Sequence, residues 1–142
     1  MQTIVIASGY FDPLHVGHVE YLKKAAALGN RLIVIVNNDE QAYLKKGRCF
    51  MPAIDRSEIV QALRSVDCTF ISFDTDRTVC KTLATVAKPY LDAKIEVIFA
   101  KGGDRTSDEI LEASTCEELG IKIVDGLGPK IRSSSKIVGG HK

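Results

Sequence analysis

Two histidines three residues apart, His15 and His18, follow an apolar run at residues 3–7 and open a segment with helical spacing. Residues at this separation lie on the same face of a helical turn, so both imidazoles could face one ligand. A helix N-terminus also favours anions, because its N–H groups and its dipole point toward them. Gly9 allows backbone to approach a ligand closely, and Gly17 shapes the turn. The sequence therefore indicates a phosphate-binding site here.

Two other interpretations of these histidines remain open. The turn could be purely structural, or His15 and His18 could hold a zinc or iron ion with Asp12 as a third ligand. The third histidine of the chain, His141, stands far away near its C-terminal end. We therefore expect no resident transition metal. No GxGxxG fingerprint is present, so the sequence also predicts no dinucleotide cofactor.

The elements that position these residues alternate regularly along the chain. Short β-branched runs predict five buried strands, at residues 3–7, 31–36, 68–72, 94–100 and 121–124. Helical spacing predicts a helix after each of the first four strands. The first covers residues 16–28, the second begins at an N-cap at Asp55, the third covers 78–88 and is ended by Pro89, and the fourth covers 107–119. A short closing helix is expected from residue 133. We expect an α/β fold, with a single Rossmann-like doubly wound sheet of about five parallel strands. Such a sheet binds ligands beyond the carboxyl ends of its strands.

Composition is typical of a single globular domain over residues 1–142. The chain has 19 basic and 18 acidic residues, a net charge of +1 and 45% hydrophobic residues. This balance predicts no binding to nucleic acid or to a membrane surface. The chain shows neither an apolar run of ~20 residues nor a secretory signal pattern. Four scattered cysteines read as reduced thiols, so we expect a cytoplasmic protein.

The segment at residues 9–18, GYFDPLHVGH, resembles the GxFDxxHxGH signature (the HxGH motif) of the cytidylyltransferase-like superfamily of nucleotidyltransferases. Further segments resemble the same superfamily in the same order: NNDEQAYLKKGR at 37–48, DRSEIVQALRSVD at 55–67, AKGGDR at 100–105 and RSSSKI at 132–137. The chain is most similar to adenylyltransferases of the heptose-phosphate type. Its short length is also similar to glycerol-3-phosphate cytidylyltransferases.

The resemblance implies transfer of a nucleotidyl group from CTP or ATP to a phosphorylated sugar or polyol, with release of pyrophosphate. It implies Mg²⁺ bound with the triphosphate, and a homodimer. The catalytic candidates are His15, His18, Lys45 and Lys46. The nucleotide-binding candidates are Gly9, Tyr10, Phe11, Asp12, Gly17, Lys101, Gly102, Gly103, Asp104, Ser133, Ser134 and Ser135. The acceptor-binding candidates are Arg48 and Arg56.

Several of these residues have a second interpretation. The two lysines and Arg48 could form a solvated surface, Asp104 could cap a turn, and the serines could be an ordinary helix cap. Gly128 stands where the cytidylyltransferases carry an arginine, a place that Lys130 or Arg132 could take. A nucleotide sensor without activity is an alternative function. It would not need both histidines, and a metal-dependent hydrolase would need more ligands than this region supplies.

The segment after the second strand predicts two further properties. Its charge and its glycine predict a loop at YLKKGR, residues 43–48, that is mobile without ligand and closes over the triphosphate. Phe50 and Met51 follow it and are expected to pack across a two-fold dimer interface.

Overall fold

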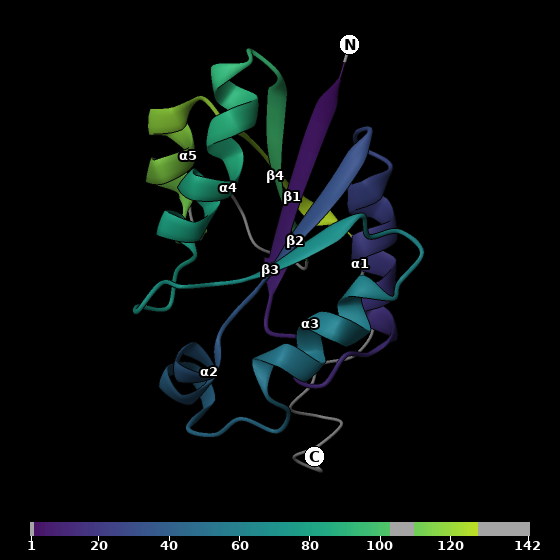
Figure 1. Ribbon diagram of the computed structural model, residues 1–142, viewed down its shortest axis with the longest axis vertical. Coiled ribbons are helices and arrows are strands. Elements are labelled where there is room, and N and C mark those ends of the chain that lie inside the picture. The colour runs from purple at the N-terminus through teal and green to yellow at the C-terminus, as the bar shows by residue number, and fades with distance from the viewer. Residues whose placement is uncertain (1, 103–109, 128–142) are drawn as a thin grey trace.

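Five strands and five helices make up the part of the chain that the computed structural model describes, residues 2–102 and 110–127 (Figure 1). The strands are β1 (Thr3–Gly9), β2 (Arg31–Val36), β3 (Cys68–Ile71), β4 (Glu96–Gly102) and β5 (Lys122–Leu127). The helices are α1 (Val16–Ala26), α2 (Asp39–Lys46), α3 (Ala53–Gln61), α4 (Cys80–Asp92) and α5 (Ala113–Leu119).

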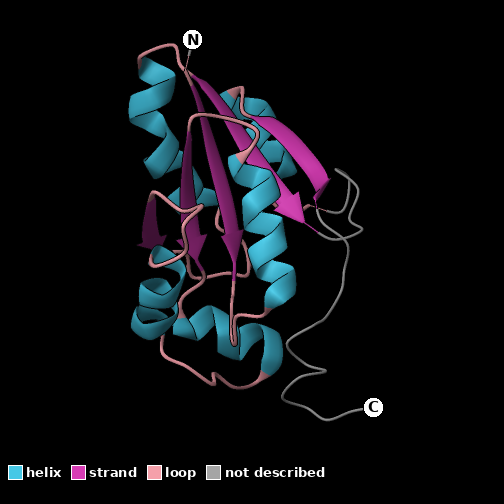
Figure 2. Cartoon of the chain, turned by 90° about the vertical axis from the view of Figure 1, so that its right-hand side faces the viewer, coloured by secondary structure: helices cyan, strands magenta, loops and turns pink. Residues whose placement is uncertain are grey.

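All five strands pair in parallel, in the order β3-β2-β1-β4-β5. Helices cover both faces of this sheet (Figure 2). The order reverses between β1 and β4, so the carboxyl end of β1 lies at the switch point where such sheets bind ligands. The predicted fold class and all five predicted strands are confirmed.

The core consists of two apolar clusters, one on each face of the sheet. Successive residues of β1 pack into opposite clusters. Val5 and Ala7 face α1 and α3, while Ile4 and Ile6 face α4 and α5. Because both faces are covered, the central strands are apolar throughout rather than alternating.

The structure corrects the prediction for the segment after β2. Residues 39–46 form helix α2 rather than a loop. Asn38 caps it by accepting the N–H of Gln41, and the Gln41 side chain accepts the N–H of Asn38 in return. Gly47 ends the helix with φ of 77°, a conformation that favours glycine. Lys45 and Lys46 therefore project from a helix end.

Several helix boundaries also differ from the prediction: α1 ends at Ala26 rather than at residue 28, and α5 begins at Ala113. Helix α3 begins after Pro52, so Asp55 lies inside its first turn and is not the N-cap. Helix α4 continues through Pro89 to Asp92, because Tyr90 and Leu91 pack against the apolar cluster. This packing outweighs the missing N–H of the proline. The predicted closing helix, and the start of the helix predicted from residue 107, lie outside the described residues.

Asp74 caps helix α4 from a distance, and its loss is expected to destabilise the fold. Its buried carboxylate accepts the N–H groups of Lys81 at 2.7 Å and Thr82 at 3.0 Å, and the Thr82 hydroxyl at 2.6 Å. Asp74→Ala should lower the free energy of unfolding by about 2–3 kcal/mol in urea titrations, because these donors lose their acceptor. Asp92→Ala is the control: its i,i+4 pair with Lys88 is exposed and worth less than ~0.5 kcal/mol. Equal losses in the two variants would contradict the capping role.

Candidate functional site

His15 and His18 cap helix α1 with their own side chains. Nδ1 of His15 accepts the N–H of Gly17, and Nδ1 of His18 accepts the N–H of His15, both at 3.1 Å. The two rings stack with their centroids 3.8 Å apart. The two imidazoles therefore lie side by side at the carboxyl end of β1. The N–H of Gly17 is used within the cap, so it is not the open phosphate donor that the sequence predicted.

The hydrogen bonds assign the proton on each ring. A ring nitrogen that accepts an N–H bond carries no proton, so both neutral imidazoles carry theirs on Nε2. The pKa of His18 is lowered to about 3, mainly because the ring is buried and to a smaller extent through electrostatic interaction with His15, Lys46 and Lys45. At neutral pH His18 is thus an uncharged hydrogen-bond donor through Nε2, in a site that also holds two ammonium groups.

The lowered pKa of His18 predicts how stability depends on pH. The unfolded chain takes up a proton at this residue near pH 6.5, whereas the folded chain does so near pH 3. Stability should therefore fall as the pH drops below 6.5, by up to about 2 kcal/mol at pH 5. Urea titrations at pH 7 and pH 5 measure this loss, and a His18→Gln variant, which does not titrate, should show a smaller one. An equal loss in both proteins would rule out His18 as the cause.

Phe11 packs against the ring of His18 from the protein core. Its side chain is 1% exposed, and its ring meets that of His18 edge-on at 5.0 Å. A Cβ added at Gly9 would lie 2.8 Å from the Phe11 ring. Gly9 is therefore needed for this internal packing, and its predicted contact with a nucleotide stays a prediction. Phe11 belongs to the core and not to an open nucleotide surface.

Lys45 and Lys46 leave the end of α2 in different directions. The Lys45 ammonium lies 4.5 Å from the centroid of the Tyr10 ring, a cation–π contact. The Lys46 ammonium donates to the backbone oxygen of Asp12 at 3.0 Å and lies 3.4 Å from its carboxylate. The structure thus brings both predicted lysines to the histidine site.

Asp12, a predicted nucleotide ligand, is fully buried. Its two carboxylate oxygens accept the N–H groups of Phe50 and Met51 at 3.0 and 2.9 Å. The carboxylate therefore binds the protein's own backbone and is not presented to a nucleotide.

Arg56 is also buried, which corrects its predicted role as an acceptor ligand. Its Nε donates to the backbone oxygen of Met51, and Nη1 donates to those of Tyr10 and Asn37, at 2.7 to 2.8 Å. Nη2 pairs with Asp39 at 2.8 Å and contacts the Cys49 sulfur at 3.9 Å. All five N–H donors are engaged, so Arg56 holds three loops together instead of binding an acceptor. Sequence reasoning missed Asp39 as its partner.

Arg48 remains a candidate for contact with an acceptor. It is exposed, and its guanidinium lies 4.4 Å from the centroid of the Phe50 ring. Phe50 itself is 42% exposed, as the sequence predicted, whereas Met51 is partly covered.

Lys101 and Gly102 lie at the end of β4, next to the end of β1. The Lys101 ammonium donates to the Ser8 hydroxyl at 3.3 Å. A Cβ at Gly102 would lie 2.9 Å from the Tyr21 ring, so this glycine makes room for a side chain of α1. The Tyr21 hydroxyl donates to the backbone oxygen of Ala100 at 2.6 Å. The predicted candidates Gly103, Asp104, Ser133, Ser134 and Ser135 lie outside the described residues.

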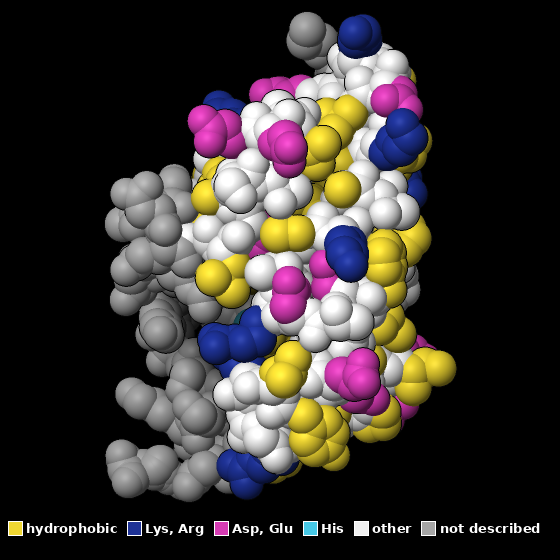
Figure 3. Space-filling view, turned by 90° about the vertical axis from the view of Figure 1, so that its left-hand side faces the viewer, with side chains coloured by type: hydrophobic (Ala, Val, Ile, Leu, Met, Phe, Trp, Pro, Cys, Tyr) yellow, Lys and Arg dark blue, Asp and Glu magenta, His cyan; other side chains and the backbone are white. Residues whose placement is uncertain are grey.

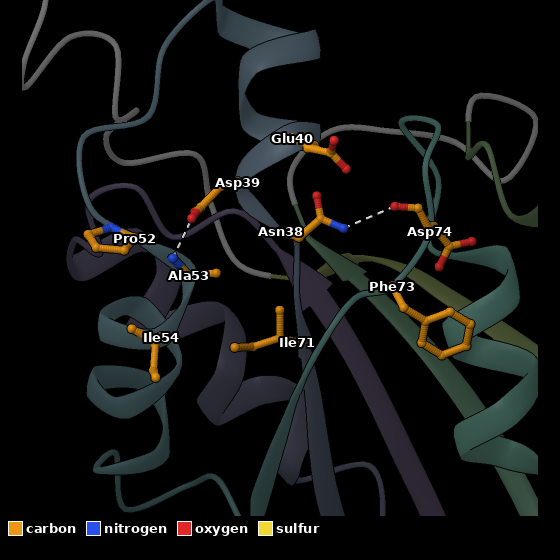
Figure 4. Close-up of a pocket in the computed structure, with 9 residues that line it drawn as sticks. All are labelled: Asn38, Asp39, Glu40, Pro52, Ala53, Ile54, Ile71, Phe73 and Asp74. Carbon is orange, nitrogen blue, oxygen red and sulfur yellow. Dashed lines mark hydrogen bonds between the residues drawn. The ribbon is translucent and has the colours of Figure 1, made fainter.

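An open hollow of about 510 Å³ lies between the start of α2, the start of α3 and the end of β3 (Figure 4). Ile54, Ile71 and Phe73 form its apolar part, and its polar lining residues are Asn38, Asp39, Glu40 and Asp74. Neither His15 nor His18 lines it. The hollow is therefore distinct from the histidine site.

The part of the chain that the structure describes shows neither a cluster of metal-binding side chains nor a membrane-spanning helix. Within residues 2–102 and 110–127, no group of three or more His, Cys, Asp or Glu side chains could hold a metal ion. None of the helices in these ranges is long and apolar enough to cross a membrane. All four cysteines are free thiols.

A family model described as cytidylyltransferase-like matches residues 6–138, which include the stacked histidines and both lysines. The chain belongs to the cytidylyltransferase-like family. The resemblance of the segment at residues 9–18 is thereby confirmed, and the fold that the family implies is the one observed.

Curated relatives of this cytidylyltransferase-like chain include a FAD synthase and a bifunctional protein HldE. The chain is 52% identical over 64 residues to a FAD synthase of Pyrococcus abyssi, covering 44% of this chain and 43% of that protein. It is 34% identical over 142 residues to the bifunctional protein HldE of Citrifermentans bemidjiense, covering 95% of this chain and 26% of that protein. The chain thus spans less than half the length of these relatives.

Solved structures support the same fold. A lipopolysaccharide core biosynthesis protein from Thermoplasma volcanium is 25% identical, with a TM-score of 0.66, over 90% of this chain and 98% of that one. A NadR protein, 16% identical with a TM-score of 0.56 over 98% of this chain and 40% of that one, shares the fold.

Proposed function

We propose that this chain transfers a nucleotidyl group from ATP or CTP to a phosphate monoester and releases pyrophosphate. The observation that carries the proposal is the stacked pair of His15 and His18, with Nε2–H donors, beside the ammonium groups of Lys45 and Lys46. Hydrogen-bond donors and fixed cations suit a reaction in which charge develops on phosphate oxygens.

The chemistry follows from these groups. An oxygen of the acceptor phosphate attacks the α-phosphorus, and the bond from this phosphorus to the bridging oxygen breaks, so pyrophosphate leaves with the electron pair. The acceptor is already an anion, and therefore no side chain has to remove a proton. The roles left to the protein are to align the two phosphates and to stabilise the charge on the α-phosphate. His18 and Lys46 are the residues that we assign to this charge.

Mg²⁺ would enter with the triphosphate, which carries the oxygen ligands that it prefers. The described side chains fit this arrangement, because the Asp12 carboxylate near the site is buried and already engaged. When bound, the ion would offset charge on the β- and γ-phosphates. We expect activity to require added Mg²⁺ and to be abolished by EDTA, with pyrophosphate release as the measurement. Full activity in EDTA would contradict this assignment.

The acceptor is proposed to be a phosphate on a polyol or sugar. The names of the relatives support this class: FAD is FMN joined to AMP, and FMN carries its phosphate on a ribityl chain. The resemblance to heptose-phosphate-type adenylyltransferases points to the same class. Arg48 is an exposed cation, stacked on Phe50, that could contact this phosphate.

The deciding experiment is a substrate panel read out by pyrophosphate release. ATP and CTP are each tested with FMN, with several sugar phosphates and with glycerol 3-phosphate, and the unphosphorylated forms of the acceptors are the controls. One triphosphate with one phosphorylated acceptor should turn over. Nucleotide binding without turnover on any acceptor would favour a nucleotide sensor instead.

We also propose a homodimer that buries the exposed apolar side chains near Phe50. Tyr43 and Leu44 of α2 are 58% and 57% exposed, and hydrophobic side chains gather toward the lower end of the face in Figure 3, where α2 lies. Sedimentation at micromolar concentration should give a dimer for the wild type, and Phe50→Glu should weaken it at least ~10-fold. A monomeric wild type would overturn this part of the proposal.

A further inference from the structure

A buried carboxylate connects the end of β1 to the segment between α2 and α3. Asp12 has no solvent-exposed surface, and its Oδ1 and Oδ2 accept the N–H groups of Met51 and Phe50 at 2.9 and 3.0 Å. Burial of a carboxylate is unfavourable unless donors or cations compensate it. Asp12 therefore fixes the path of residues 47–52, which are far from it in sequence.

The same residue also holds one lysine of the proposed catalytic set. The Lys46 ammonium lies 3.0 Å from the backbone oxygen of Asp12 and 3.4 Å from Oδ2, and the Lys46 side chain is 23% exposed. The Lys45 ammonium lies 4.5 Å from the centroid of the Tyr10 ring. Asp12 thus orients Lys46.

Asp12 holds Lys46 next to Phe11, whose ring meets that of His18 edge-on with the centroids 5.0 Å apart. The charge of Lys46 is also among the causes that lower the pKa of His18. A free lysine side chain has several rotatable bonds, and fixing it on substrate binding would cost conformational entropy. Holding it in advance removes that cost from the reaction.

We propose that Asp12 is a positioning residue, which places the Lys46 ammonium beside His18 and docks the segment 47–52 before the triphosphate binds. This inference rests on the proposed function, because it assigns Lys46 to the α-phosphate. It replaces the sequence prediction that Asp12 contacts the nucleotide itself.

Two double-mutant cycles test the proposal. Asp12→Asn should lower kcat ~10–100-fold in the wild-type background, with a smaller change in the KM for triphosphate. In a Lys46→Ala background, where there is no ammonium to position, the same substitution should lower kcat by less than ~3-fold. In a Lys45→Ala background, which leaves the Asp12–Lys46 pair in place, it should keep its full effect. Equal losses in all three backgrounds would show a merely structural role and overturn the proposal.

A second measurement needs neither activity nor an Asp12 variant. Limited acetylation of the wild-type protein, followed by peptide mass spectrometry, compares the reactivity of Lys45 and Lys46. The pairing with Asp12 should make Lys46 react about fivefold more slowly than Lys45. Equal reactivity would overturn the proposal even if the protein is an active transferase. Slow acetylation of Lys46 in a protein that turns over no substrate would instead count against the proposed function alone.

Discussion

Replacing His18 with alanine is expected to lower kcat of the nucleotidyl transfer by ~10²–10³, with only a modest rise in the KM for triphosphate. The Nε2–H of His18 is the donor that we assign to the α-phosphate oxygens. A donor in this place gains strength as negative charge develops on those oxygens, so its loss affects the transition state more than the bound substrate. Pyrophosphate release under saturating substrates measures the effect.

The control for this variant is folding, because His18 also caps helix α1 through Nδ1. Loss of a cap costs ~1 kcal/mol, so thermal unfolding of His18→Ala should show a folded protein. His18→Gln restores an amide donor and should recover part of kcat. Near-normal turnover of the folded alanine variant would contradict the assigned role. Since the pKa of His18 in the ligand-free protein is about 3, the pH profile of kcat/KM should show no ionisation of this residue between pH 5 and pH 8.

Arg56→Lys is expected to lower the free energy of unfolding by about 3–5 kcal/mol, a change that should reduce the melting temperature by roughly 10 °C or more. The guanidinium is fully buried and donates to Tyr10, Asn37, Met51 and Asp39. A lysine has three donors at a single point, so it leaves several of these buried oxygens without a partner.

The matched control is Arg48→Lys, because Arg48 is an exposed arginine in the connection that leads into α3, the helix of Arg56. This change should leave the melting temperature nearly unaltered and, if Arg48 contacts the acceptor phosphate, raise the KM of the acceptor. The opposite pattern, a stable Arg56→Lys protein with a raised KM of the acceptor, would restore Arg56 as an acceptor ligand. Thermal unfolding and initial rates on the same preparations separate the two outcomes.

The local pattern of apolar residues was sufficient to predict all five strands of the sheet. The strands of this protein are buried on both faces and therefore appear as continuous apolar runs, which a sequence displays directly. The start of α1 could also be predicted from the sequence, since His15, Gly17 and His18 lie within one helical turn.

Helix α2 shows where local signals were present but overlooked. Asn38 followed three residues later by Gln41 is a capping-box pattern, and Gly47 suits a helix end. The charged residues between them favoured a loop interpretation, which was wrong. For α4, packing of Tyr90 and Leu91 on the core overrode the local stop at Pro89.

The sequence alone determined the fold class and the family, because these depend on local periodicity and on a motif within ten residues. Only the tertiary structure decided which charged residues face inward. Asp12 and Arg56 have the residue types of ligand-binding groups, yet they bind backbone groups that lie up to 46 residues away in the chain. A charged side chain binds whichever partners folding brings within hydrogen-bond distance, and residue type and spacing do not specify those distant partners.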